Sequence, residues 1–227
     1  MRSATENNSF STNFYQKTKY FLIPYMVFLI IGAIPLVLFT DESITLWINE
    51  NHDPALDFFF KYATFMGDGI FYGIMLIPLL FISVRWGITG LLAYSASGLI
   101  TQAIKRIAAM PRPKAFFESV DLNFIENVTM YSNYSFPSGH TTSAFSLFLL
   151  LAFITKKQSL SFLFLLLAII AGLSRVYLFQ HFYSDIYAGS IVGVIFTYII
   201  ILIMQKATTK REDHWLNNSI IKSFSKK

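Results

Sequence analysis

Apolar residues occur along this chain in long runs that are separated by short polar stretches. Six of these runs approach the roughly 20 residues that a helix needs to cross a bilayer. A helix satisfies its own backbone hydrogen bonds, which lipid cannot do, so the pattern predicts six membrane-spanning helices. We expect them at residues 20–39, 63–83, 87–104, 138–155, 160–178 and 182–204.

The stretch between the first two runs carries shorter apolar patterns. Two sets of residues keep helical spacing there, one on each side of Pro54: Ile44, Trp47 and Ile48, then Leu56, Phe59 and Phe60. The spacing predicts short helices that lie in the membrane interface. They form either an anchored connector, which interfacial aromatic residues favour, or a lid that guides a lipid. Asp68, between Gly67 and Gly69, is interpreted as a turn residue at the interface rather than a relay acid.

Composition agrees with a membrane protein of one domain. Of the 227 residues, 54% are hydrophobic and 14% are charged. The basic residues are scattered between apolar runs, which argues against binding of nucleic acid, and the absence of cysteine excludes disulfides and thiolate metal sites. We expect an all-α polytopic membrane protein, with six transmembrane helices in one bundle and the short interfacial helices on the outer side. Its parts are a cytoplasmic tail at 1–18, a membrane domain at 19–205 and a basic cytoplasmic tail at 206–227.

The basic residues also indicate an orientation, because cytoplasmic loops are enriched in lysine and arginine. With the N-terminus inside, the cytoplasmic segments hold twelve of the 18 basic residues: Arg2, Lys17, Lys19, Arg85, Lys156, Lys157, Lys206, Lys210, Arg211, Lys222, Lys226 and Lys227. The opposite orientation would place these twelve outside. We therefore expect both termini in the cytoplasm, and residues 105–140 and 175–185 on the outer side.

Three clusters of ionisable and polar residues stand at the outer ends of the predicted spans. They are Lys105 with Arg112-Pro113; Pro137-Ser138-Gly139-His140; and Ser174-Arg175 with His181 and Asp185. An ionisable group inside a membrane costs several kcal/mol, so such clusters indicate function. One lysine and two arginines suit phosphate oxygens. A helix that begins at Ser138 and Gly139 favours an anion through its free N–H groups.

The two histidines add groups for nucleophilic attack and for proton transfer near neutral pH. His181 and Asp185 are four residues apart, so on a helix the carboxylate can orient the imidazole. Arg175 lies six residues before His181, roughly 120° away on an unbroken helix, so the chain must turn between them if they share one site.

Each cluster also has a simpler interpretation when taken alone. Lys105 and Arg112 can reach lipid headgroups, Ser138 can cap a helix, and His181 with Asp185 can tie two helices together. His140 and His181 could also be ligands of a metal or haem. One carboxylate and two imidazoles beside three cations make a poor cation site, so no metal or other cofactor is expected.

Together the three clusters resemble the signature of the type 2 phosphatidic acid phosphatase family, also called lipid phosphate phosphatases. Its motif Lys-x6-Arg-Pro matches residues 105–113, Pro-Ser-Gly-His matches 137–140, and Ser-Arg-x5-His-x3-Asp matches 174–185. Every signature position is filled, and three motifs at this spacing are far more specific than one. Tyr183 stands where many relatives have proline, at a position without a chemical role.

The resemblance implies an integral-membrane, metal-independent phosphatase that cleaves a lipid phosphate or diphosphate through a phosphohistidine. In that mechanism His181 attacks phosphorus, Asp185 orients His181, and His140 protonates the leaving oxygen and then activates water. The residues that bind the phosphoryl group are Lys105, Arg112, Ser138, Gly139 and Arg175.

The residues leave the lipid open among phosphatidylglycerol phosphate, phosphatidic acid, undecaprenyl diphosphate and lipid A phosphate. The small size and short loops look bacterial, so we expect an inner-membrane protein with its active site on the periplasmic side. No obligate protein partner is evident. The alternative is an anion-binding or lipid-transporting membrane protein on the same scaffold without hydrolysis, although binding alone needs no nucleophile. A vanadate-using oxidase is a third interpretation, since haloperoxidases resemble the family's site; those enzymes are soluble, which the apolar runs oppose.

Overall fold

The structure, a computed structural model, describes residues 4–120, 124–155, 157–208 and 216, and within these ranges it is helical with no strand. Most of the predicted C-terminal tail, together with Lys156, lies outside the described residues. The elements are α1 (Ala4–Leu38), α2 (Asp41–Glu50), α3 (Pro54–Ala63), a 3-10 helix η1 (Thr64–Gly67), α4 (Gly69–Ile82), α5 (Val84–Ala108), α6 (Pro113–Phe116), α7 (Gly139–Ile154), α8 (Gln158–Tyr177) and α9 (Tyr183–Thr208).

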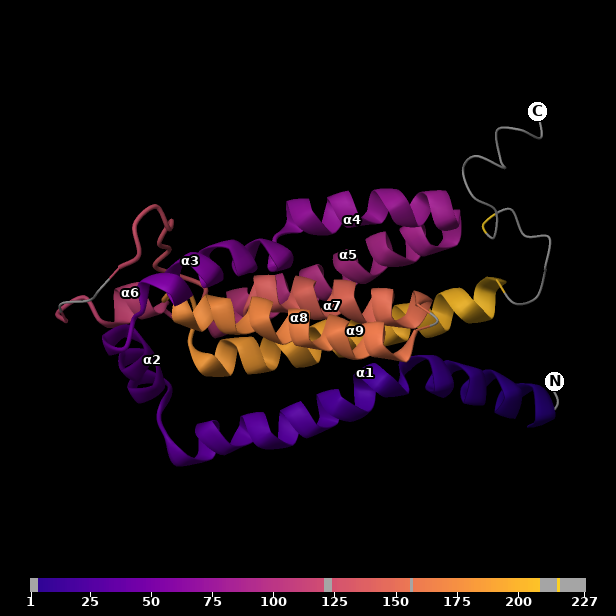
Figure 1. Cartoon of the computed structure of the whole chain (residues 1–227), viewed down its shortest axis with the longest axis horizontal. Coiled ribbons are helices and arrows are strands. Elements are labelled where there is room, and N and C mark those ends of the chain that lie inside the picture. Colours follow the sequence, from indigo (N-terminus) through magenta and orange to yellow (C-terminus); the bar gives the residue numbers. More distant parts are fainter. Residues whose placement is uncertain (1–3, 121–123, 156, 209–215, 217–227) are drawn as a thin grey trace.

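The long helices α5, α7, α8 and α9 lie alongside one another, with α4 against α5 and α1 along the other side of the bundle (Figure 1). The short helices α2, α3 and α6 gather at one end. At that end α5 and α8 finish and α7 and α9 begin, whereas the start of α1 and the finish of α9 lie at the opposite end. The three predicted clusters therefore stand at the same end of the bundle.

Side-chain caps determine where several helices begin. Asp53 accepts hydrogen bonds from the backbone N–H groups of Ala55 and Leu56 and starts α3, with Pro54 in its first turn. Asp68 caps α4 in the same way. The predicted helix at 63–83 is consequently divided at this aspartate into η1 and α4, and the axes of Pro54–Gly67 and Gly69–Ile82 differ by 57°.

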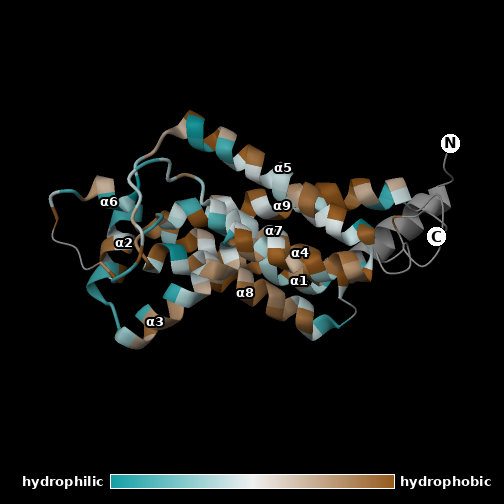
Figure 2. Cartoon of the chain, turned by 90° about the horizontal axis from the view of Figure 1, so that it is seen from above, coloured by the Kyte–Doolittle hydropathy of each residue, from teal (hydrophilic) through white to brown (hydrophobic). Residues whose placement is uncertain are grey.

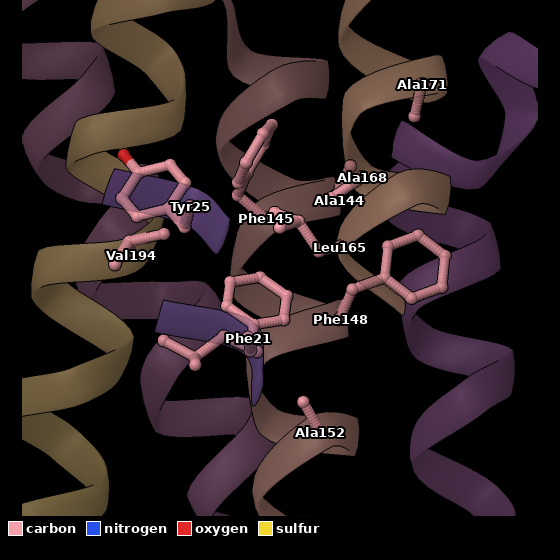
Figure 3. Packing of buried hydrophobic residues seen from close by; sticks show 11 residues of the cluster. Phe21, Tyr25, Ala144, Phe145, Phe148, Ala152, Leu165, Ala168, Ala171 and Val194 are labelled. Atoms are coloured by element: carbon pink, nitrogen blue, oxygen red, sulfur yellow. The ribbon is translucent and has the colours of Figure 1, made fainter. Parts of the chain in front are cut away.

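Helix α7 forms the centre of the bundle and is buried along most of its length. Its Phe145 and Phe148 pack with Phe21 and Tyr25 of α1 and with Leu165 of α8 (Figure 3). A helix that is apolar all round belongs in the core, because it has no face suited to solvent.

Glycines bring α9 against the backbone of α7. A Cβ atom at Gly189 would lie 2.6 Å from the carbonyl oxygen of Ser138, and one at Gly193 would lie 2.5 Å from that of Thr142. Small residues four apart allow this close helix contact. The contact places Asp185, one turn earlier on α9, beside the start of α7, where the N–H of Ser138 donates to its carbonyl at 2.9 Å.

Three described segments are long and apolar enough to cross a membrane: Thr18–Leu38, Gln158–Tyr177 and Tyr183–Thr208. The bent pair Pro54–Gly67 and Gly69–Ile82 would add a fourth if it counts as one span. Figure 2 shows hydrophobic residues along the middle of the long helices and hydrophilic residues towards the ends. At 16 residues, α7 is short for a straight span. The predicted count of six spans therefore stays a prediction, while the two short helices predicted around Pro54 are confirmed as α2 and α3.

Candidate active site

The first cluster is held in place by carbonyl groups. The Nζ atom of Lys105, in the last turn of α5, donates to two carbonyls of the loop before α7, one of them that of Ser135 at 2.8 Å. The guanidinium of Arg112 donates to the carbonyls of Asn133 at 3.0 Å and Gln180 at 3.1 Å. Neutral carbonyls orient these two cations but do not cancel their charge, so the positive field remains available to an anion.

Arg175 lies in the last turn of α8 and is buried, and its guanidinium donates hydrogen bonds to two side chains. It donates to Oγ1 of Thr64 at 2.6 Å and to Oε1 of Gln180 at 3.3 Å, and its buried Nε has no hydrogen-bond partner among the described residues. The chain then turns through Phe179, which has a left-handed backbone conformation with φ 59°. The turn returns the N–H of His181 to the carbonyl of Arg175 at 3.1 Å. The predicted turn between this arginine and this histidine is confirmed.

His181 and Asp185 form a pair closed to solvent, with 1% and 0% of their surfaces exposed. Nδ1 of the imidazole lies 3.0 Å from Oδ2 of the carboxylate. The same oxygen accepts the N–H of Phe182 at 2.9 Å and the hydroxyl of Ser135. The Oδ2 atom accepts hydrogen bonds from these groups, so the imidazole nitrogen facing it, Nδ1, carries the proton. The lone pair of Nε2 is then available.

Burial lowers the pKa of His181 well below its ordinary value of 6.5, and the charges of Arg112, Arg175 and Lys105 act in the same direction. The imidazole is therefore neutral at neutral pH. A neutral imidazole with a free Nε2 is the form that can act as a nucleophile or base.

The second cluster forms the first turn of α7. The hydroxyl of Ser138 accepts the N–H of Thr141 at 3.4 Å and caps the helix, which was the simpler interpretation of this residue. Gly139 faces open space, since no atom of the described residues lies within 4 Å of where its Cβ would be. A cavity of about 510 Å³ begins beside Gly139 and His140 and lies between the start of α7 and α5, where Tyr94 and Leu99 line it. An anion at this helix start would meet free N–H groups without steric obstruction.

His140 lies within electrostatic range of Lys105, Arg112, Arg175 and His181. The eight residues predicted for the site are therefore gathered in one region by the ends of α5 and α8, the starts of α7 and α9 and the loops between them.

Four polar residues around the site were not assigned to it from the sequence: Thr64, Asp68, Ser135 and Gln180. Thr64 and Gln180 hold Arg175, and Ser135 binds Asp185. Asp68 caps α4, which confirms its interpretation as a turn residue, but its Oδ2 also lies 3.8 Å from Nε2 of His140. Its position in an otherwise apolar run was the one signal that could have marked it.

A sequence model of the PAP2 superfamily matches residues 86–209, which is more than half of the chain and includes all three motifs. The chain belongs to the PAP2 superfamily. This confirms the resemblance on which the sequence prediction was based.

Curated relatives of this PAP2 protein carry the names of lipid phosphatases. Phosphatidylglycerophosphatase B of Bacillus subtilis is 24% identical over 68% of this chain and 74% of its own length. The lipid A 4'-phosphatase of Bacteroides thetaiotaomicron is 26% identical over 75% of this chain and 79% of its own. A dihydrosphingosine 1-phosphate phosphatase of Schizosaccharomyces pombe is 32% identical over 63% of this chain, but the match spans 36% of that protein. A probable lipid phosphate phosphatase of Arabidopsis thaliana is matched over 41% of its length.

Two crystal structures have similar folds. LpxE of Aquifex aeolicus matches with a TM-score of 0.63 and 27% identity over 70% of this chain and 93% of that one. A transmembrane PAP2-type phosphatidylglycerolphosphate phosphatase of Bacillus subtilis matches with a TM-score of 0.59 and 25% identity over 87% of this chain and all of that one. The apolar helices and the similarity to a transmembrane phosphatase of this superfamily show that the chain is an integral membrane protein.

Proposed function

We propose that this PAP2 protein is a metal-independent phosphatase that removes phosphate from a lipid phosphate or diphosphate through a phosphohistidine. The observation that carries the proposal is the buried His181–Asp185 pair, placed among cations that bind carbonyl and hydroxyl oxygens. Within the part of the chain that the structure describes, Lys105, Arg112 and Arg175 form no ion pair with a carboxylate. A neutral nucleophile inside a positive field suits attack on an anionic phosphate ester.

The first half-reaction forms a bond between Nε2 of His181 and phosphorus, while the bond from phosphorus to the lipid oxygen breaks. Asp185 stabilises the positive charge that develops on the imidazole. Lys105, Arg112 and Arg175 neutralise the phosphoryl oxygens, as metal ions do in many other phosphoryl-transfer enzymes. His140 gives its proton to the departing lipid oxygen.

The second half-reaction returns the enzyme to its starting state. His140, now neutral, takes a proton from a water molecule whose oxygen attacks phosphorus. The bond between nitrogen and phosphorus breaks, inorganic phosphate leaves, and His181 is neutral again. Nδ1 of His181 stays bound to Asp185 throughout, so His181 acts through Nε2 alone.

The cavity beside His140 supports a place for the lipid part of the substrate. It lies next to the first turn of α7, and its walls mix small residues such as Gly98 with the apolar Leu99 and the polar Gln102. A headgroup at Gly139 and His140 would leave the lipid's glycerol or sugar portion inside this cavity and its tails towards the bilayer.

The proposed setting is a six-span protein of a bacterial inner membrane, with both termini in the cytoplasm and the site facing the periplasm. Support comes from the distribution of basic residues and from the common end of the bundle at which the three motifs meet. The relatives include enzymes named for phosphatidylglycerol phosphate and for lipid A. Phosphatidic acid and undecaprenyl diphosphate remain candidates beside these two.

Phosphate release by the purified protein in detergent tests the proposal. The four candidate lipids are compared in one detergent with a chelator present, for wild type and for His181→Ala. We expect release from at least one lipid, inhibition by vanadate and loss of release in the variant. Tight binding of these lipids without release of phosphate by wild type would instead favour an anion-binding or lipid-transporting protein.

A further inference from the structure

Asp68 stands between η1 and α4 and uses its two carboxylate oxygens differently. Oδ1 accepts the N–H of Ile70 at 2.6 Å and caps α4. Oδ2 lies 3.8 Å from Nε2 of His140, and each of these two side chains is 35% exposed. One oxygen thus holds the turn, while the other presents a negative charge to the imidazole.

The turn that carries Asp68 is packed tightly against the start of α7. A Cβ atom at Gly67 would lie 2.6 Å from the carbonyl oxygen of His140, and one at Gly69 would overlap the hydroxyl of Tyr94. Neither flanking residue can carry a side chain without moving its neighbour. The local chain is therefore shaped so that the aspartate between the two glycines approaches His140 closely.

The other charges that face His140 are positive. They come from four parts of the chain, namely Lys105 of α5, Arg112 of the following loop, Arg175 of α8 and His181 of the turn before α9 when that residue is protonated. The phenol of Tyr94 of α5 lines the same cavity, and Asp185 of α9 is bound to His181. In the described part of the chain, Asp68 is the carboxylate that forms a charge contact with His140.

We propose that Asp68 is a positioning residue that holds a proton on His140. This rests on the proposed function, in which His140 must carry a proton when the bond from phosphorus to the lipid oxygen breaks. A nearby carboxylate favours the imidazolium form and so opposes the surrounding cations. The proton passes from Nε2 to the leaving oxygen, and the neutral imidazole then accepts one from water. Asp68 itself touches no reacting atom.

The distance between Asp68 and His140 determines how strongly the carboxylate affects protonation of the imidazole. A gap of 3.8 Å is too long for a direct hydrogen bond, and partial exposure weakens the attraction between the charges. Removal of the carboxylate charge should therefore shift the protonation of His140 by roughly one pH unit rather than several. The rate above the pH optimum should fall by roughly tenfold, as one such unit implies.

The test uses Asp68→Asn, because asparagine caps a helix as well as aspartate does but carries no charge. Asp68→Glu restores the charge. Asp53→Asn is the matched control, since it makes the same change at the cap of α3, outside the site. Turnover of the preferred lipid is measured against pH for all three variants and for wild type. We expect the alkaline limb of kcat to move to lower pH in Asp68→Asn, with KM unchanged, and to return towards wild type in Asp68→Glu.

If Asp68 had a purely structural role, Asp68→Asn would lower activity equally at all pH values, and the alkaline limb of kcat would stay at the wild-type pH. That result, or a wild-type profile in Asp68→Asn, would overturn the inference. If wild type itself releases no phosphate from any lipid of the panel, the proposed function fails, and Asp68 is then judged by a second measurement.

The second measurement follows the imidazole of His140 directly. The chain has four histidines, so the NMR signals of histidine-labelled protein in micelles can be assigned by loss of one signal in His140→Gln. We expect the titration midpoint of this signal to lie at lower pH in Asp68→Asn than in wild type or Asp53→Asn. Equal midpoints would refute the role of Asp68 whether or not the protein is an active phosphatase.

Discussion

Nδ1 of His181 lies 3.0 Å from Oδ2 of Asp185, and neither side chain is open to solvent. The pair spans one turn at the start of α9, where glycines press this helix against α7. The geometry makes the carboxylate an orienting group, since it fixes which imidazole nitrogen carries the proton. In the catalytic triads of hydrolases an aspartate fixes the tautomer and orientation of a histidine in the same way.

Asp185→Asn removes the charge of this orienting group while it keeps the shape. The amide allows the wrong tautomer of His181, so kcat should fall by roughly a thousandfold or more, as for comparable replacements in hydrolase triads. Phosphate release from the preferred lipid measures the loss. Circular dichroism and a thermal melt establish that the variant is folded, and a folded variant with wild-type kcat would contradict the assigned role.

Ser135 is predicted to support the pair from the loop before α7. Its buried hydroxyl donates to Asp185, so Ser135→Ala should lower the free energy of unfolding by about 1 kcal/mol and should also reduce kcat. Ser132→Ala is the matched control, because this exposed serine contributes its backbone carbonyl to Arg112 rather than its side chain. Equal activity of the two variants and wild type would show that the hydroxyl does not position the carboxylate.

The neutral state of His181 predicts an acidic limit to activity. Since burial lowers its pKa, the side chain stays neutral through pH 6.5, and the nucleophile is lost only when acidification reaches the lowered pKa. The acid limb of kcat/KM should therefore lie below pH 6.5. A limb above that value in wild type would show that the imidazole is protonated at neutral pH.

The same shift has a consequence for stability. In the unfolded chain His181 binds a proton near pH 6.5, whereas in the folded protein it does so only at lower pH. This group's contribution to stability is thus complete above pH 6.5 and is lost as the pH falls below it. As the pH is lowered below 6.5, the melting temperature should fall less steeply for His181→Asn than for wild type. A steeper fall in the variant would contradict this direction of the pH dependence.

Gly189→Ala tests the close contact that aligns the two helices of the site. The added methyl group would lie 2.6 Å from the carbonyl oxygen of Ser138, so the helices must separate. We expect a lower melting temperature and a loss of activity together. Gly73→Ala is the control, because no atom in the described part of the chain lies within 4 Å of where a Cβ at Gly73 would be, and alanine there should be neutral or stabilising. If the two variants behaved alike, the contact would not be needed to assemble the site.

Much of the fold was predictable because long apolar runs and helix caps are local properties of the chain. The short helices on either side of Pro54 and the turn between Arg175 and His181 follow from spacing alone. The sequence predicted a turn at Asp68 but still placed one helix over 63–83, because the apolar run continues on both sides of this residue.

The main components of the site were also predictable, because residue types that are costly in a membrane stand out at the ends of apolar runs. The contacts that support these residues could not be predicted from the sequence. Ser135 reaches Asp185 through the path of an irregular loop, and Gln180 holds Arg175 across a left-handed turn. Contacts of this kind depend on tertiary packing, which periodicity along the chain does not describe.

The central claim is that His181 forms a covalent bond to phosphorus, and rapid quenching with a radiolabelled lipid phosphate tests it most directly. Wild type quenched early in the reaction should carry labelled protein, and the label should be labile in acid and stable in base, as expected of a phosphohistidine. No label should appear in His181→Ala. Labelling that persists in His181→Ala, or phosphate release at the wild-type rate by that variant, would contradict the account.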